Sequence, residues 1–164
     1  GDAATASSIF SVDLRGWGDT QMALYPYELA GWGGIDRYLA YTTAALGDAI
    51  LAMRIRDALA ALAYLRTRPE VGWIVVSGSG LGGVVAKHVA AIDGGLDGVV
   101  VWEDLRSFEE LVGQEGETWP QDAFYPNVLL HYDLPELTAA VACPVVEVAS
   151  EAEIVAALIG ALEA

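Results

Sequence analysis

The stretch Trp73–Gly83, with the sequence WIVVSGSGLGG, places the strongest constraint on how this chain folds. Its four apolar residues, Trp73–Val76, are followed by turn residues and predict a short buried strand. A glycine-rich turn comes next, and the residues from Val84 onward suit a helix. A turn of this kind can either raise a nucleophile above the end of a sheet or cradle a phosphate. We refer to residues 77–83 as the glycine turn.

A nucleophile in the pattern G-x-S-x-G can be placed on the glycine turn in two registers. If Gly78 and Gly82 are the outer glycines, the central position is Gly80, which has no side chain. If Ser79 is central, both outer glycines are lost. The first register is therefore favoured, and Ser77 and Ser79 are interpreted as small turn residues. The sequence predicts the frame of a nucleophile turn without its nucleophile.

Composition limits the possible classes of protein. A length of 164 residues suits one domain, and a hydrophobic content of 54% disfavours disorder. The apolar runs are too short to span a bilayer. A formal net charge of −15 argues against nucleic acid or an anionic membrane as a partner. The single cysteine, Cys143, excludes an internal disulfide and a cysteine metal cluster.

Apolar strand-like segments alternate with helix-like segments, which is typical of an α/β fold with a parallel sheet. The segment Leu96–Trp102 is uniformly apolar, as expected of a strand covered on both faces. An irregular loop that can include a helical turn is expected over residues 25–41. The expected strands are Ser8–Leu14, Trp73–Val76, Leu96–Trp102 and Pro144–Ala149. The expected helices cover residues 43–66, 83–92, 134–141 and 151–162, with a short one starting near Ser107.

Four further segments stand in a distinctive order around the glycine turn. They are Asp13–Thr20 (DLRGWGDT), Arg54–Leu59 (RIRDAL), Arg68–Val71 (RPEV) and His131–Leu137 (HYDLPEL). Together they resemble the acetyl xylan esterase and dienelactone hydrolase-like branch of the α/β-hydrolases. The DLRGWGDT segment resembles the family's turn after the fourth strand. The RIRDAL and RPEV segments resemble the helix and the lead that precede the nucleophile strand, and HYDLPEL resembles a segment before the seventh strand. The resemblance implies hydrolysis of carboxylic esters through an acyl-serine intermediate.

The chain also departs from that family. It begins at about the fourth strand, so three strands are missing together with the loop that supplies one oxyanion donor. The nucleophile position is Gly80, and no histidine follows the last expected strand. We therefore expect a single truncated α/β-hydrolase-like domain over residues 1–164, with a parallel sheet of about four strands and flanking helices. It is expected to be catalytically inactive as this chain alone.

The candidate site residues are few. Leu81 would still offer the backbone N–H that follows a nucleophile, and Glu151 stands at the family's acid position. An acidic residue is also favoured in the first turn of a helix, which explains Glu151 without chemistry. His88 is interpreted as a partly exposed helix residue and His131 as a structural hydrogen-bonding residue. No metal site and no cofactor are expected. The vestigial turn consists of Ser77, Gly78, Ser79, Gly80, Leu81 and Gly82.

Two other interpretations remain open. The spacing of Gly78, Gly80 and Gly83 fits the dinucleotide pattern G-x-G-x-x-G, and Glu103 and Asp104 stand near the end of the next strand, where such a fold needs an acidic residue. The chain could instead be a non-enzymatic binding or assembly module that keeps the hydrolase scaffold. The surrounding segments favour the hydrolase-like interpretation over the dinucleotide one.

The order of the strands also predicts assembly. Strands near Phe10, Val75, Val100 and Val146 would progress in one direction, so right-handed crossovers would place their helices on one face. The other face and the edge next to the missing third strand would be exposed. We therefore expect a homo-oligomer, or a partner chain that covers the exposed sheet face, with no nucleic acid and no membrane as partner.

Overall fold

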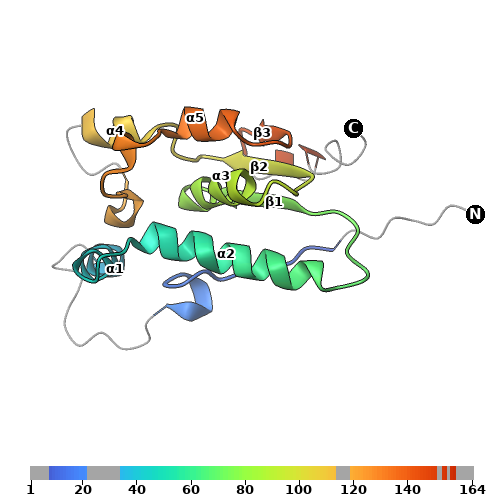
Figure 1. Ribbon diagram of the computed structural model, residues 1–164, viewed down its shortest axis with the longest axis horizontal. Coiled ribbons are helices and arrows are strands. Elements are labelled where there is room, and N and C mark those ends of the chain that lie inside the picture. Colours follow the sequence, from blue (N-terminus) through green and yellow to red (C-terminus); the bar gives the residue numbers. More distant parts are fainter. Residues whose placement is uncertain (1–7, 22–33, 114–118, 151–152, 155, 158–164) are drawn as a thin grey trace, which may run out of the picture.

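The computed structural model describes residues 8–21, 34–113, 119–150, 153–154 and 156–157. They form an α/β fold built on a parallel sheet in the order β1-β2-β3 (Figure 1). The strands are β1 (Val75–Ser79), β2 (Gly98–Trp102) and β3 (Val145–Glu147). The α-helices are α1 (Gly34–Ala45), α2 (Ile50–Arg66), α3 (Leu81–Asp93), α4 (Phe108–Gly113) and α5 (Leu134–Ala139). Short 3-10 turns are η1 (Gly18–Thr20), η3 (Gln121–Ala123) and η4 (Val128–Leu130). The predicted α/β class is confirmed.

The expected first strand, Ser8–Leu14, is not a strand, so the described sheet has three strands and not four. A strand exists only where its backbone groups meet those of a neighbour. No hydrogen bond of the described chain involves the backbone of residues 8–13. The segment instead runs along α2, where the ring of Phe10 meets that of Tyr64 (Figure 1). Its last residue, Leu14, is buried in the core.

The helix predicted over residues 43–66 is broken into α1 and α2. Gly47 adopts a φ of +77°, which ends α1, and the Asp48 carboxylate accepts the N–H of Ala49 just before α2 begins. In the loop with a helical turn expected over residues 25–41, the helical part is longer than expected, because α1 occupies the residues from 34 onward. Residues 25–33 lie outside the described residues.

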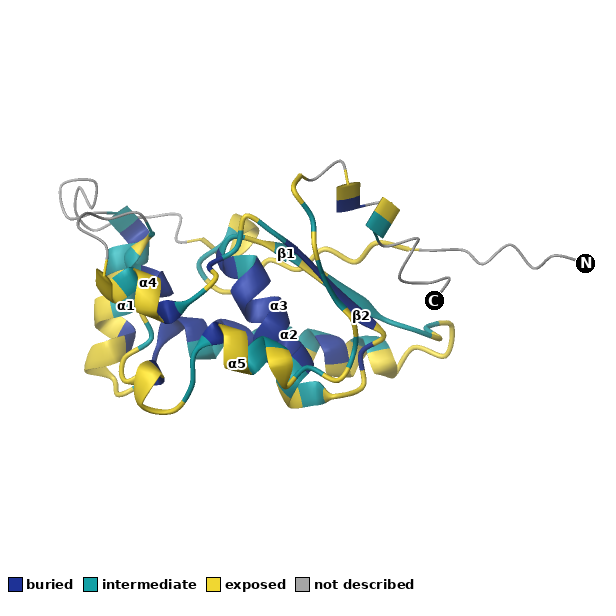
Figure 2. Ribbon diagram, turned by 90° about the horizontal axis from the view of Figure 1, so that it is seen from above, coloured by how far each residue is buried: buried dark blue, intermediate teal, exposed yellow. Residues whose placement is uncertain are grey.

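The core lies between α2, α3 and the sheet. Leu51 and Ile55 of α2 are buried, as the apolar stripe predicts, and Val84 and Val89 of α3 have no more than 1% of their surface exposed. Figure 2 shows α3 and α5 on the same side of the sheet, with α3 dark blue along most of its length. The predicted placement of the helices on one face is therefore confirmed for α3 and α5.

The two faces of the sheet differ between strands. All three central valines of β2 are fully buried, so β2 is covered on both faces as predicted. In β1, Gly78 faces α3, whereas Ser77 and Ser79 point to the opposite face and are exposed. The expected bare apolar face is thus reduced to a polar strip at β1. Ile154, within the predicted helix 151–162, is buried, and only residues 153, 154, 156 and 157 of that helix are described.

No helix among the described residues is long and apolar enough to cross a membrane.

Candidate functional site

A single residue, Gly80, joins β1 to α3. Its φ of 52° and ψ of −126° form a backbone conformation that residues with a side chain rarely adopt. The Gly80 N–H donates to the Trp102 carbonyl at 3.2 Å, and the Gly80 carbonyl accepts the Gly83 N–H at 3.1 Å. The predicted strand, turn and helix are confirmed. The turn is tighter than predicted, because α3 already begins at Leu81.

The other glycines of the turn have separate structural roles. A Cβ atom added at Gly78 would lie 2.3 Å from the backbone carbonyl of Gly82, so Gly78 lets the strand and the helix approach closely. A Cβ added at Gly83 would lie 2.6 Å from the Cβ of Asp104. At Gly80 and Gly82 an added Cβ would meet nothing within 4 Å. The space that a nucleophilic side chain would enter at Gly80 is therefore open.

Neither serine of the turn is placed for nucleophilic chemistry. Ser77 and Ser79 are exposed, and among the described residues no hydrogen bond reaches either hydroxyl. A serine becomes nucleophilic when a neighbouring base accepts its proton. The prediction that both serines are turn residues is wrong, because β1 runs past the predicted end at Val76 and includes Ser77 and Ser79.

The acidic residues after β2 are placed differently from one another. The Asp104 side chain is 7% exposed, and its Oδ2 lies 2.7 Å from the Nζ atom of Lys87, whose side chain is 3% exposed. Glu147, at the end of β3, is mostly exposed and lies 3.6 Å from the same Nζ. Glu103 is exposed with a φ of 49°. The Asp104 carboxylate is therefore already paired with Lys87. The exposed Glu103 is the other acidic residue that could bind the ribose of a dinucleotide.

His88 is buried, contrary to the expectation of a partly exposed helix residue. Its Nδ1 lies 2.7 Å from the Val84 carbonyl and its Nε2 lies 2.8 Å from the Tyr132 hydroxyl. Burial lowers the pKa of His88, which favours the neutral ring. Both nitrogens are thus engaged: Nδ1 within α3, and Nε2 in the contact that joins α3 to the segment containing Tyr132. His131 is exposed.

Asp133 ties two helices together. Its carboxylate accepts hydrogen bonds from the Ser107 hydroxyl, the Phe108 N–H and the Leu134 N–H, and it caps α5 in a capping box with Glu136. Burial alone would raise the pKa of Asp133, but these hydrogen bonds outweigh it and lower the pKa. The HYDLPEL segment is therefore structural at this residue.

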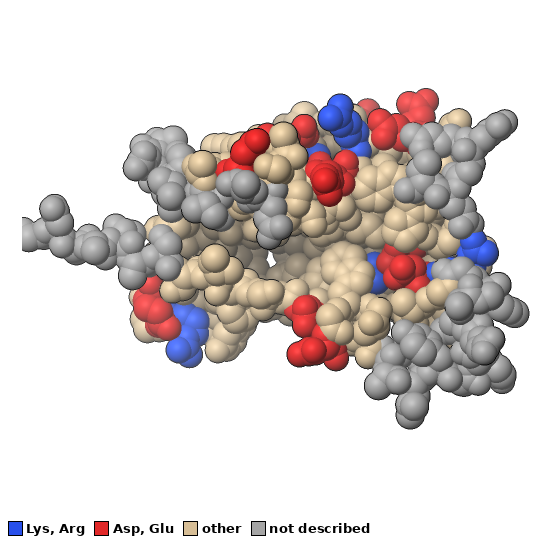
Figure 3. Space-filling model, turned by 180° about the vertical axis from the view of Figure 1, so that it is seen from behind, with Lys and Arg blue, Asp and Glu red and all other residues tan. Residues whose placement is uncertain are grey.

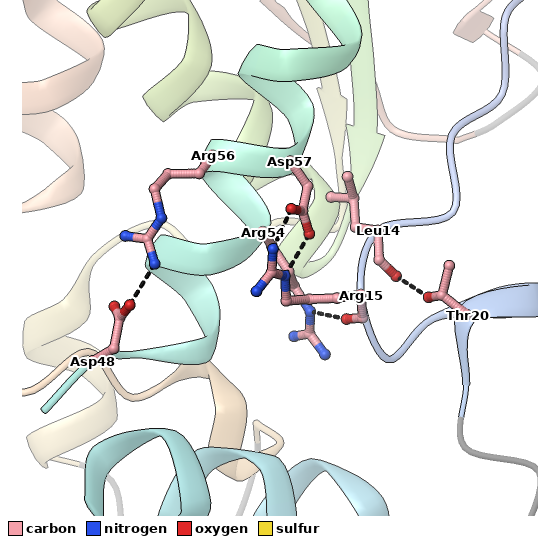
Figure 4. Close-up of polar contacts among 7 residues, drawn as sticks. All are labelled: Leu14, Arg15, Thr20, Asp48, Arg54, Arg56 and Asp57. Carbon is pink, nitrogen blue, oxygen red and sulfur yellow. Dashed lines mark hydrogen bonds and ion pairs between the residues drawn. The ribbon is translucent and has the colours of Figure 1, made fainter. Parts of the chain in front are cut away.

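The DLRGWGDT turn is also held by its own side chains (Figure 4). Arg15 donates two hydrogen bonds to Asp57 of α2, at 2.6 and 2.5 Å. The Thr20 hydroxyl lies 2.6 Å from the Leu14 carbonyl, and Arg54 Nε donates to the Arg15 carbonyl at 3.0 Å. The order of residues in this motif is thus explained by how the turn docks on α2.

Sequence reasoning missed a buried ion pair beneath that turn. Arg54 Nη1 lies 2.5 Å from Asp122 Oδ2, and the two side chains are 0% and 1% exposed. The Arg54 guanidinium also stacks over the ring of Trp17, at 4.1 Å from its centroid. Burial, together with the nearby Asp122, raises the pKa of Asp36 on α1. The signal was present, because Arg54 falls on the apolar stripe of α2, three residues after Leu51.

An apolar groove lies beside α4 and η4. Its volume is about 210 Å³, and its lining residues carry no ionisable acid or base other than a tyrosine. Ligand sites that perform acid–base chemistry need converging polar groups, which this groove lacks. Within the described chain no group of three metal-ligating side chains comes together. The predicted acid position, Glu151, lies outside the described residues.

Comparison with protein-family models, with curated proteins and with solved structures gives no match.

Proposed function

We propose that this chain is an α/β-hydrolase-like protein related to carboxylic-ester hydrolases that does not hydrolyse esters by itself. One observation carries the proposal. The turn between β1 and α3 has the sharp strand-to-helix geometry of a nucleophile turn, and its central residue is Gly80. The backbone frame is kept while the reacting atom is missing.

The chemistry of acyl transfer explains why the frame alone is insufficient. Attack on an ester requires a nucleophile, a base that accepts its proton and donors for the oxyanion. The N–H of Leu81 is one such donor. His88 uses both ring nitrogens in packing, and Ser79 has no base beside it among the described residues. A single donor without the other two groups contributes little.

The direct test is the hydrolysis of a short p-nitrophenyl ester by the purified protein. We expect no turnover above buffer and no labelling by a fluorophosphonate probe. Ser79→Ala is the matched control, because it removes the one alternative nucleophile of the turn. Probe labelling of the wild type that disappears in Ser79→Ala would overturn the proposal. The Gly80→Ser variant should remain a poor enzyme, since it still lacks the base.

A dinucleotide site at the same turn is the competing proposal. It is supported by the spacing of Gly78, Gly80 and Gly83 at the start of α3 and by the exposed carboxylate of Glu103. A dinucleotide at a hundredfold excess over its Kd would stabilise the fold by ~2.7 kcal/mol. We expect no shift of the melting temperature with NAD, NADP or FAD, and a saturable shift would favour this alternative.

The role that fits a scaffold without a nucleophile is binding or assembly. We therefore propose that a second copy of the chain or another polypeptide covers the part of the sheet that β1 leaves exposed.

A further inference from the structure

Strand β1 has one edge that is free of backbone partners among the residues that the structure describes. The Gly80 N–H bonds to the Trp102 carbonyl and the Ile74 carbonyl accepts the Asp97 N–H, so the even-numbered residues of this strand direct their backbone groups toward β2. Alternate residues of a strand direct those groups to opposite edges. The N–H and C=O groups of Val75, Ser77 and Ser79 therefore point away from β2. None of them is bonded within the described chain.

A second unpaired length of backbone lies in residues 8–13. Ile9 is 93% exposed, and Phe10 and Val12 are also exposed, although this is the sequence that most favours a strand in the N-terminal part. Seen from behind, the molecule is hollowed across its middle, between the layer that holds the sheet and the layer that holds α2 (Figure 3). Acidic side chains lie on both sides of this hollow (Figure 3). Both stretches can accept an extended neighbour.

The charge of the chain indicates what that neighbour is. The formal net charge is −15, from 23 acidic residues against eight Lys and Arg. Most of these cationic side chains already form ion pairs with carboxylates of the same chain. They are Arg15, Arg54, Arg56, Arg66, Arg68 and Lys87. A second copy would bring another −15 to the contact, and like charge opposes association. A basic partner is attracted by the same field.

We propose that the free edge of β1 binds an extended strand of a separate polypeptide, with small or apolar residues flanked by lysine or arginine. The inference rests on the proposed assembly role and names its partner. Main-chain hydrogen bonds to Val75, Ser77 and Ser79 supply the affinity. The basic flanks supply the attraction to the acidic surface and select against a second copy.

The test uses the whole chain and a fluorescein-labelled probe peptide of sequence KKVTVTVKK, with binding followed by fluorescence anisotropy. Ser77→Pro removes an N–H at the free edge and leaves the ladder to β2 intact, because Ser77 does not bond to β2. Ser77→Ala removes the hydroxyl and keeps the backbone. We expect Ser77→Pro to weaken binding at least tenfold and Ser77→Ala to bind as the wild type does.

Three further arms make the outcome decisive. KKVPVPVKK has the same charge but cannot form a strand, and EEVTVTVEE has the opposite charge; neither should bind. Equal binding of KKVPVPVKK would overturn the proposal, since attraction alone would then suffice. If Ser77→Pro fails to fold, N-methylation of alternate amides of the probe replaces it, and undiminished binding of the N-methylated probe overturns the proposal.

The remaining outcome concerns self-association. Light scattering should give a monomer without peptide, and hydrogen exchange should show the amides of Val75, Ser77 and Ser79 unprotected until the probe is added. A dimer that already protects these amides would overturn the proposal in favour of a second copy. Ester turnover together with normal binding of the probe peptide would contradict the proposed lack of hydrolysis. It would not contradict the proposed binding site at the edge of β1.

Discussion

The glycine turn gives a graded series of substitutions with different expected costs. Gly80→Ala forces a residue with a side chain into a φ of 52° and a ψ of −126°, which costs roughly 1–3 kcal/mol. The loss of backbone freedom in the unfolded chain returns ~0.4–1 kcal/mol, so the net cost is about 1–2 kcal/mol. In a chain of this length such a change lowers the melting temperature by roughly 2–8 °C.

Two neighbours provide the matched controls. Gly82→Ala lies in α3, meets nothing within 4 Å and has no positive φ, so it should stabilise the protein by ~0.5–1 kcal/mol. Gly78→Ala places a Cβ 2.3 Å from the Gly82 backbone, which no side-chain rotation can relieve. It should therefore be the most damaging of the three.

The assay is thermal and urea unfolding of the three variants beside the wild type. The expected order of stability is Gly82→Ala, wild type, Gly80→Ala and Gly78→Ala. If Gly80→Ala is as stable as Gly82→Ala, Gly80 does not have the positive φ described here. The observation on which the proposed function rests would then be wrong. If Gly78→Ala is tolerated, β1 and α3 do not approach as closely as described.

Two further predictions concern the buried charges. Asp122→Asn leaves the Arg54 guanidinium without its counter-charge in a fully buried site, and it should lower the free energy of unfolding by roughly 3–5 kcal/mol. The control Glu70→Gln breaks the exposed pair with Arg68 and should not measurably change the melting temperature. Comparable effects of the two variants would contradict the buried pair. The pKa of Asp36 is raised in the folded state, so its contribution to stability is complete below about pH 4 and is lost as the pH rises through the folded value. Asp36→Asn should therefore be more stable than the wild type at neutral pH and lose that advantage in acid, as measured by urea unfolding across this range; a constant difference would show that Asp36 does not titrate as described.

The sequence predicted the fold class and the elements that local physics determines. The strand before Ser77, the glycine turn and α3 follow from apolar runs and glycines that act within a few residues. The strand Ser8–Leu14 was wrong because strand propensity has no effect without a neighbour to bond. The break between α1 and α2 was missed because the apolar stripe begins only at Leu51 and does not test the residues before it. The positive φ of Gly47 is visible only in the folded backbone.

The sequence predicted the strand, the glycine turn and the helix around the candidate site, but it did not predict the ion pairs near them. The spacing of the glycines predicted Gly80 at the centre of the turn, where its backbone has φ 52° and ψ −126°; that this is an empty nucleophile position stays a prediction. The pairing of Arg54 with Asp122 joins residues 68 positions apart, and that of Lys87 with Asp104 depends on how α3 lies against the end of β2. Periodicity places a residue on a face but does not identify its partner. His88 was misjudged for the same reason, since its burial depends on Tyr132.

The vacant turn and the free edge belong to the same short strand. A catalytic turn must be held to within ~0.5 Å of its working geometry by the packing and hydrogen bonds around it. Here β1 is bonded to β2 along one edge and packed by α3 on one face, and no described residue bonds to its other edge. Such a strand is poorly suited to hold a strained nucleophile and well suited to accept a neighbour. Glycine at position 80 removes the strain that a side chain would impose there. The proposed binding role and the proposed lack of hydrolysis can therefore be tested on the same strand.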